Sequence, residues 1–158
     1  MADEGKTTTI PQRVGRVYMD GVFDMMHRGH LEAIKKCAAL GDEVVIGVVS
    51  DSDCESYKRR PIIREQDRAE MVRHCALVSD VVFPCPMSVS EDFLAKHRID
   101  LVVHGFADSA EFESQKKYFE VPIRRGIFRR IQYHGGVSTT QIIQRVLHLG
   151  LHESSQST

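Results

Sequence analysis

Two histidines flank a glycine in the segment at residues 20–30, whose sequence is DGVFDMMHRGH. His27 and His30 lie where we expect the first turn of a helix, directly after a short strand. The first N–H groups of a helix have no partners within it and carry partial positive charge, so this position favours an anion. Gly29 allows a ligand to approach the backbone closely. The segment therefore predicts an anion-binding site to which both imidazoles add donors.

Two other interpretations of the histidine pair remain open. A surface turn that happens to carry two histidines needs no function at all. A metal pair of the H-E-x-x-H kind requires i, i+4 spacing within a helix, whereas His27 and His30 are spaced i, i+3 across a helix start. Because no third ligand is obvious either, a metal site is the least favoured of the three interpretations.

Two further segments carry residue types that bind anions. Lys58 opens a basic run after the second predicted strand, and its compact, flexible ammonium group suits a mobile triphosphate. Residues 135–140, GGVSTT, combine glycines with hydroxyl groups at the expected start of the last helix, which makes a second anion cradle. Taken singly, the first is better explained as a solvated, charged loop, and an ordinary capped turn, which is common, would explain the second.

Strands and helices are predicted to alternate along the chain. The run Val44–Val49 is continuously apolar, apart from a glycine, as in a strand buried on both faces of a parallel sheet. Gly41 and Gly150 are expected to end helices, and Ser138 with Gln141 has the spacing of a capping box. The other predicted strands are 16–19, 80–83, 99–104 and 127–131, and the predicted helices are 31–40, 65–76, 90–97 and 138–150.

This alternation predicts a doubly wound, Rossmann-like α/β fold, with a parallel sheet and helices on both faces. Ligands of such folds bind beyond the carboxyl ends of the strands, where the strand order reverses. All three anion-binding segments follow strands, so we expect them at one edge of the sheet. Together they predict a site for a polyphosphate.

Composition limits the remaining possibilities. The 158 residues suffice for one domain, which we expect at 14–150 between disordered polar tails at 1–13 and 151–158. A net charge of −1 argues against a nucleic-acid-binding face, and no apolar run approaches the ~20 residues of a membrane span. No signal peptide is apparent, and the four cysteines form no C-x-x-C pair. We therefore expect reduced thiols and a cytoplasmic location.

The segments described above resemble the signatures of the cytidylyltransferases, a branch of the nucleotidyltransferases. Residues 27–30, HRGH, match H-x-G-H, and residues 136–140, GVSTT, resemble the end of R-T-E-G-I-S-T-[ST]. Lys58 stands where this family keeps a lysine, and the similarity spans about residues 14–149. The segments VVHG at 102–105 and RGIFRRI at 125–131 resemble the ethanolamine-phosphate members in particular.

The resemblance implies a fold of the nucleotidyltransferase type and transfer of a cytidylyl group from CTP to phosphoethanolamine, giving CDP-ethanolamine and pyrophosphate for phosphatidylethanolamine synthesis. It implies Mg²⁺ carried by the triphosphate rather than by a protein metal site, and a homodimer with the first strand–helix region near its contact. The residues it implies are catalytic His27, His30 and Lys58; nucleotide-binding Val22, Phe23, Asp24, Gly29, His104, Gly105, Arg130, Gly136, Ser138, Thr139 and Thr140; and substrate-binding Lys58, Met87 and Phe106.

The sequence also departs from the family pattern. Tyr133 and Ala76 stand where the family usually has arginine, and Arg59 stands where it usually has glycine. Two lost phosphate contacts leave a non-catalytic, CTP-binding half of a two-domain enzyme as an alternative, unless Arg59, Arg129 or Arg130 supplies the charge. Ethanolamine-phosphate members usually contain two such halves, whereas this chain contains one.

The identity of the phospho-alcohol is a separate question, and choline phosphate and glycerol 3-phosphate are the alternatives. The segments 83–87 and 104–107 are expected to line the alcohol pocket. In the first segment, Met87 replaces an aromatic residue of the family. In the second segment, Phe106 is the aromatic residue. An incomplete aromatic cage holds choline poorly, whereas Asp108 and nearby carbonyl groups suit a primary ammonium with N–H donors. We therefore expect a preference for ethanolamine.

Overall fold

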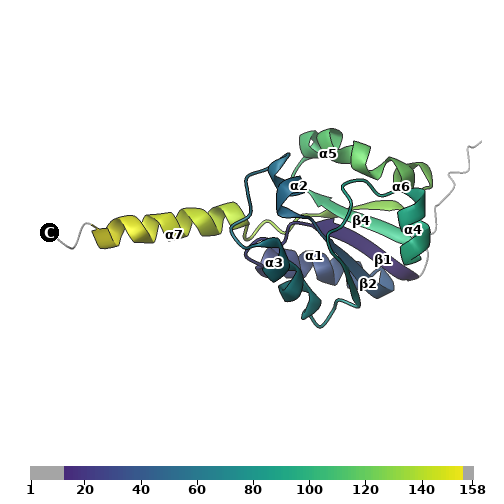
Figure 1. Cartoon of the computed structure of the whole chain (residues 1–158), viewed down its shortest axis with the longest axis horizontal. Helices are drawn as coiled ribbons and strands as arrows, with labels where there is room; N and C mark the ends of the chain where they lie inside the picture. Colours follow the sequence, from purple (N-terminus) through teal and green to yellow (C-terminus); the bar gives the residue numbers. More distant parts are fainter. Residues whose placement is uncertain (1–12, 155–158) are drawn as a thin grey trace, which may run out of the picture.

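A five-stranded sheet forms the frame of the computed structural model, which describes residues 13–154 (Figure 1). The strand order is β3-β2-β1-β4-β5, and every neighbouring pair is parallel. This confirms the predicted doubly wound α/β fold. The strands are β1 (Val14–Gly21), β2 (Gly41–Val48), β3 (Asp80–Val82), β4 (Leu101–Phe106) and β5 (Phe128–Gln132).

The neighbouring strands β1 and β2 each carry an apolar stretch that is covered on both faces of the sheet. Val17 pairs with Val44 and Met19 pairs with Ile46 across the ladder, and all four side chains are buried. Branched side chains pack well on a pleated surface, so continuous runs of this kind are stable only inside such a sheet. The order reverses at β1, which has β2 on one side and β4 on the other.

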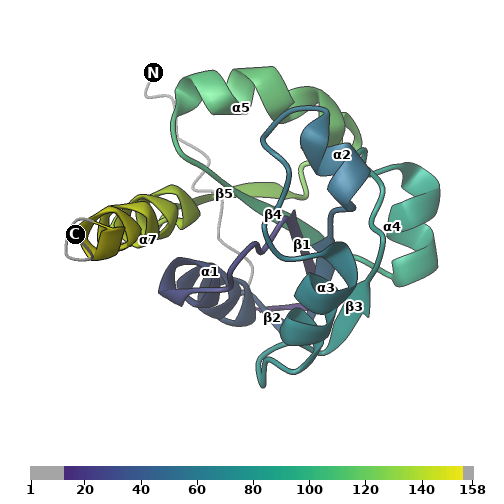
Figure 2. The same ribbon diagram turned by 60° about the vertical axis from the view of Figure 1, so that its left-hand side comes forward.

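Helices cover both faces of the sheet (Figures 1 and 2). On one face, Ile34 of α1 (Arg28–Ala38) and Val72 of α3 (Glu65–Arg73) pack on the sheet. On the other, Phe93 of α4 (Glu91–His97) and Phe119 form a second core. The remaining helices are α2 (Asp51–Glu55), α5 (Ser109–Gln115), the 3₁₀ helix η1 (Lys116–Phe119), α6 (Glu120–Arg124) and α7 (Thr139–Ser154).

Both glycines expected to end helices have other roles. Helix α1 ends with Ala39 in a right-handed conformation, and Gly41 is the first residue of β2, where any side chain would collide with Val17. Helix α7 continues through Gly150 to Ser154. The capping box is confirmed, because the Ser138 N–H donates to Gln141 Oε1 at 2.9 Å and the Gln141 N–H donates to Ser138 Oγ at 3.2 Å.

Helix α7 projects away from the α/β body (Figure 1) and leaves Val146, Leu147 and Leu149 exposed. Its last turn extends into the expected C-terminal tail, while residues 1–12 and 155–158 lie outside the described residues. Within residues 13–154, no helix combines the length and apolar character that crossing a membrane requires. All four cysteines are free.

Candidate functional site

A cavity of about 450 Å³ opens at the carboxyl ends of β1, β4 and β5. It therefore lies where the strand order reverses, as expected for this class of fold. The structure brings most of the predicted site residues together in its lining, which includes Val22, Phe23, Asp24, His27, Gly29, His30, Lys58, His104, Gly105, Ser138, Thr139 and Thr140.

The two histidines form the start of helix α1. His27 is the N-cap residue, and its Nδ1 accepts a hydrogen bond from the Gly29 N–H at 3.0 Å. His30 Nδ1 accepts from the His27 N–H at 3.2 Å, and the two rings stack with centroids 4.0 Å apart. Because both Nδ1 atoms accept backbone N–H groups, each neutral ring carries its proton on Nε2. The backbone thus fixes both imidazoles as Nε2–H donors.

Burial keeps these rings neutral. Desolvation lowers the pKa of His27, and it lowers the pKa of His30 to about 4, with the neighbouring His27 as the next contribution. Both rings therefore donate hydrogen bonds at neutral pH without carrying charge. Such donors suit an oxyanion whose negative charge increases during a reaction.

The distant GVSTT segment meets the histidine pair directly. His27 Nε2 lies 3.3 Å from Thr139 Oγ1, and the Thr139 hydroxyl donates to the backbone carbonyl of Asp24 at 3.2 Å. Gly29 is required here, since a Cβ would lie 2.8 Å from the His27 ring and 3.1 Å from the Val137 carbonyl oxygen. The start of α7 is thereby held against the start of α1, so that the N–H groups which the two capping boxes leave unused meet at one cavity.

Asp24 fixes the loop that carries Lys58. Its carboxylate accepts hydrogen bonds from the backbone N–H groups of Ile62 and Ile63, both at 2.9 Å, and from the Arg59 guanidinium at 3.0 Å. Burial alone would raise the pKa of Asp24, but these hydrogen bonds outweigh burial and lower it. Asp24 thus acts on the Lys58 loop, with no hydrogen bond from its side chain to the histidine rings among the described contacts.

The loop before α1 is itself strained. Phe23 and Met25, on either side of Asp24, have φ angles of 54° and 47°, in the left-handed region. Non-glycine residues there cost of order 1 kcal/mol each, so surrounding contacts must hold them. The hydrogen bonds that Asp24 makes on both its side chain and its carbonyl supply that restraint.

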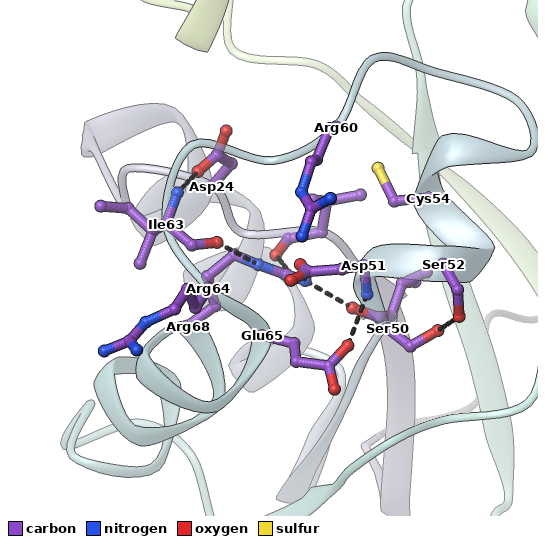
Figure 3. A network of polar contacts seen from close by, with 12 residues as sticks. Asp24, Ser50, Asp51, Ser52, Cys54, Arg60, Ile63, Arg64, Glu65 and Arg68 are labelled. Atoms are coloured by element: carbon purple, nitrogen blue, oxygen red, sulfur yellow. Dashed lines mark hydrogen bonds and ion pairs between the residues drawn. The ribbon is translucent and has the colours of Figure 1, made fainter.

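Arg68 joins several segments around the loop that precedes α1 (Figure 3). Its side chain is fully buried and donates to the carbonyl oxygens of Val22, Val49 and Ile63, and to Asp51 Oδ1 at 2.7 Å. One guanidinium therefore joins the β1–α1 loop, the end of β2, helix α2 and the segment before α3. The sequence alone gives no signal that distinguishes this arginine from the exposed ones near it.

Several expected site residues lie elsewhere. Phe106 is buried in the second core, and the Arg130 guanidinium stacks over the Phe112 ring at 4.4 Å and over Phe106 at 5.7 Å. Neither lines the cavity, nor does Gly136. Asp108 caps helix α5 by accepting from the Glu111 N–H at 2.8 Å, which corrects its expected role as an ammonium acceptor. Phe106 and Arg130 lie within β4 and β5, and their side chains pack away from the cavity.

Met87 lines a small cavity of about 30 Å³ beside the main one. The linings of the two cavities share Asp20, Tyr57, His104 and Gln115. His104 Nδ1 lies 2.8 Å from Asp20 Oδ1. Tyr57, Tyr118 and Phe119 are aromatic residues of this small lining, whereas Phe106 is not part of it.

Sequence reasoning missed Glu111 and Gln115, which reach the main cavity from helix α5. Tyr133 and His134 also line it, and Tyr133 packs beside Gly105 with half of its side chain exposed. Burial, followed by the charge of Glu111, raises the pKa of Tyr133. Helix α5 is short and buries no residue, so it has no apolar periodicity that could have predicted it.

The three arginines that could replace the charge lost at Ala76 and Tyr133 lie in different places relative to the cavity. Arg59 lines the cavity but is paired with Asp24, whereas Arg129 and Arg130 are absent from the lining. Ala76 is exposed and also outside the lining. Lys58 is thus the less tightly paired of the two lysine and arginine side chains in the lining, with Glu111 Oε1 at 3.7 Å against 3.0 Å between Arg59 and Asp24.

A parallel sheet whose reversal point carries an H-x-G-H helix start, a lysine loop and a second helix start defines a nucleotide-binding domain of the nucleotidyltransferase type. Residues 18–145 match the Cytidylyltransferase-like family. The chain belongs to this family.

Named relatives agree with the resemblance seen in the sequence. The chain is 37% identical to Ethanolamine-phosphate cytidylyltransferase of Arabidopsis thaliana, over 84% of this chain and 32% of that relative. It is 36% identical to Ethanolamine-phosphate cytidylyltransferase of Dictyostelium discoideum, over 89% of this chain and 39% of that relative. Choline-phosphate cytidylyltransferase A of Homo sapiens is 33% identical, over 92% and 40%. The chain thus spans less than half the length of these relatives.

A solved structure shows the same fold. The lipopolysaccharide core biosynthesis protein from Thermoplasma volcanium GSS1 superposes with a TM-score of 0.59 at 25% sequence identity. The match covers 76% of this chain and 96% of that protein. The likeness therefore extends over most of the α/β body.

Proposed function

We propose that this domain transfers a cytidylyl group from CTP to phosphoethanolamine, giving CDP-ethanolamine and pyrophosphate. The observation that carries the proposal is the meeting of His27, His30, Lys58 and the start of α7 around one cavity. Relatives named ethanolamine-phosphate cytidylyltransferase support the choice of alcohol, although choline-phosphate relatives match over a similar length.

In the proposed reaction, a phosphate oxygen of phosphoethanolamine attacks the α-phosphorus of CTP. The bond from that phosphorus to the oxygen bridging to the β-phosphate breaks, and pyrophosphate leaves with the electron pair. The nucleophile has a second pKa near ~6 and is mostly dianionic at pH 7, so it requires no general base. The domain must instead align two anions and offset their repulsion.

The site residues fit these two tasks. The Nε2–H group of His30 would donate to triphosphate oxygens, most strongly in the transition state, and that of His27 would do so by exchanging Thr139 Oγ1 for a phosphate oxygen. Lys58 would neutralise charge between the two phosphates. The N–H groups of Thr139 and Thr140 and the hydroxyls of Ser138 and Thr140 would hold the β- and γ-phosphates.

Mg²⁺ is proposed to enter with the triphosphate. Within residues 13–154, no group of three or more His, Cys, Asp or Glu side chains is placed to hold a metal ion. Its ligands would therefore be phosphate oxygens and water, as is usual for Mg²⁺ at nucleotide sites. When bound, the ion would supply neutralisation of charge on the leaving pyrophosphate.

The test is pyrophosphate release from CTP with phosphoethanolamine, phosphocholine and glycerol 3-phosphate as separate acceptors. We expect kcat/KM to be highest for phosphoethanolamine, with phosphocholine lower by roughly tenfold because an aromatic cage is incomplete. A preference for either other acceptor would replace the proposed substrate. CTP binding without any pyrophosphate release would instead favour a non-catalytic half, as the losses at Ala76 and Tyr133 allow.

We also propose that the domain forms a homodimer, as the family resemblance implies, and that it works in the cytoplasm. Val146, Leu147 and Leu149 on the projecting helix α7 add exposed apolar surface that association would cover. Sedimentation at micromolar concentration should show twice the 17.9 kDa mass of the chain. A monomer alone would remove the dimer from the proposal.

A further inference from the structure

Three carboxylates line the main cavity, and they differ in how tightly they are engaged. Asp20 has His104 Nδ1 at 2.8 Å, and Asp24 has Arg59 at 3.0 Å together with two backbone N–H groups. Glu111 faces Lys58 at 3.7 Å, beyond hydrogen-bond distance. The Lys58–Glu111 pair is therefore the loosest ion pair of the lining.

The Glu111 carboxylate is nevertheless held in one orientation. Its Oε2 accepts from the Ala107 N–H at 2.6 Å, and its Oε1 accepts from Gln115 Nε2 at 3.1 Å. An ionised carboxylate offers about four acceptor positions, so acceptor capacity remains after these two bonds. The side chain is 25% exposed and lines the cavity, so an incoming ligand can reach it.

Lys58 is equally available, because 48% of its side chain is exposed. Its ammonium lies near the Tyr57 ring, 5.5 Å from the centroid. The cavity thus presents one cation and one anion side by side, both solvated and neither firmly bonded to the other. An exposed pair of this kind contributes little stability, so breaking it costs little.

A zwitterionic ligand is complementary to such a pair. We infer that Glu111 binds the ammonium group of phosphoethanolamine while Lys58 binds its phosphate, so that the substrate inserts between the two side chains and exchanges partners with both. This inference rests on the proposed function and assigns the headgroup contact to Glu111 on helix α5. The exchange replaces one ion pair by two, without leaving any charge unpaired.

The same geometry explains discrimination between headgroups. A primary ammonium has three N–H donors and forms charge-assisted hydrogen bonds to Glu111 Oε1. A trimethylated ammonium has no N–H donor and keeps only the Coulomb attraction. A neutral hydroxyl keeps a hydrogen bond but loses the charge. Glu111 therefore favours the primary ammonium over both.

The test compares phosphoethanolamine with 2-hydroxyethyl phosphate, a near-isostere in which a hydroxyl replaces the ammonium. In the unaltered chain, kcat/KM should favour phosphoethanolamine. Glu111→Gln should lower that preference at least tenfold, through KM for phosphoethanolamine, and leave KM for CTP unchanged. Glu111→Asp, which keeps the charge but withdraws it by one methylene, should lower the preference by less.

Glu113→Gln is the matched control. Glu113 lies on the same helix, is 61% exposed and pairs with Lys116 at 2.6 Å outside the cavity. We expect it to leave the preference unchanged. Equal losses for both acceptors in Glu111→Gln would show a merely structural role and overturn the inference. Loss of the preference in Asp20→Asn, with Glu111→Gln unaffected, would assign the ammonium to Asp20 instead.

The inference and the proposed function fail in different ways. If neither acceptor supports pyrophosphate release, the proposed reaction is wrong, and calorimetric titration of both compounds then tests Glu111. Phosphoethanolamine should bind at least tenfold more tightly than 2-hydroxyethyl phosphate, and Glu111→Gln should remove the difference. No binding of phosphoethanolamine, or an unchanged difference, would overturn the role of Glu111.

Discussion

His27 Nε2 lies 3.3 Å from the hydroxyl oxygen of Thr139, although 112 residues separate the two in the chain. The Thr139 hydroxyl in turn donates to the Asp24 carbonyl, so its oxygen is oriented to accept from the His27 N–H. This contact ties the two anion-binding helix starts into one site. It also aligns the His27 ring before any ligand arrives.

Thr139→Val should lower kcat about tenfold, because His27 loses the acceptor that orients its ring. Thr139→Ser keeps the hydroxyl and should stay within about threefold of the unaltered chain. Steady-state kinetics with saturating CTP would measure both variants. Equal kcat for Val and Ser would show that the hydroxyl has no positioning role.

His30→Ala should lower kcat by roughly a hundredfold or more while the fold survives, because one preorganised donor to the triphosphate is lost. The His30 side chain is only partly buried and packs mainly on the neighbouring His27 and Phe23 rings, so circular dichroism should show that the fold is retained. Pyrophosphate release is the measurement. Turnover at the parent rate would remove His30 from the catalytic group.

Lys58→Ala should raise KM for CTP or for the phospho-alcohol and also lower kcat. Its charge acts on the bound substrates as well as on the transition state, so both parameters should change. Arg60→Ala is a suitable control, since Arg60 is 71% exposed, pairs with Glu55 and lies outside the cavity lining. Unchanged KM values for both substrates in Lys58→Ala would exclude Lys58 from the site.

Arg68→Met should lower the free energy of unfolding by about 3 kcal/mol or more. The substitution leaves the carbonyls of Val22, Val49 and Ile63 without their donor and leaves Asp51 without its partner. Arg64→Met should change it by less than about 0.5 kcal/mol, because Arg64 is 82% exposed and pairs with Asp67 at the surface. Urea unfolding would compare the two, and similar midpoints would contradict the anchoring role of Arg68.

Stability should fall as pH decreases below 6.5, in part because of His30. Its pKa in the folded chain is about 4, below its ordinary value of 6.5, so the unfolded chain takes up the proton first. The unfolding free energy should therefore fall by up to about 1.4 kcal/mol per pH unit between pH 6.5 and 4 from this residue. His30→Asn removes this contribution. The unfolding free energy of the unaltered chain minus that of the variant should therefore be about 2 kcal/mol larger at pH 7.5 than at pH 5. Parallel pH profiles would show that His30 titrates normally.

The sequence predicted the frame because its signals are local. The apolar run from Val44 to Val49 requires a strand covered on both faces, and the Ser138–Gln141 spacing identifies the start of the last helix. The glycine-flanked histidines follow β1, so their place at the carboxyl edge is a consequence of the alternating pattern. Gly41 and Gly150 show the limit of such signals, since glycine also occurs where two strands approach closely and within a helix.

Tertiary structure alone decided which side chains face the cavity. Phe106 and Arg130 share a face of the sheet with His104, two residues along β4 and opposite it on β5, yet Phe106 packs into the second core and Arg130 stacks on the Phe112 ring. Glu111 reaches Lys58 because helix α5 folds back over the sheet edge, and this short helix has no apolar period in the sequence. Local patterns determined the strands, the helix starts and the residue types of the site. The pairing of Glu111 with Lys58, Asp24 with Arg59 and His27 with Thr139 depended on contacts between distant segments, which no local pattern encodes.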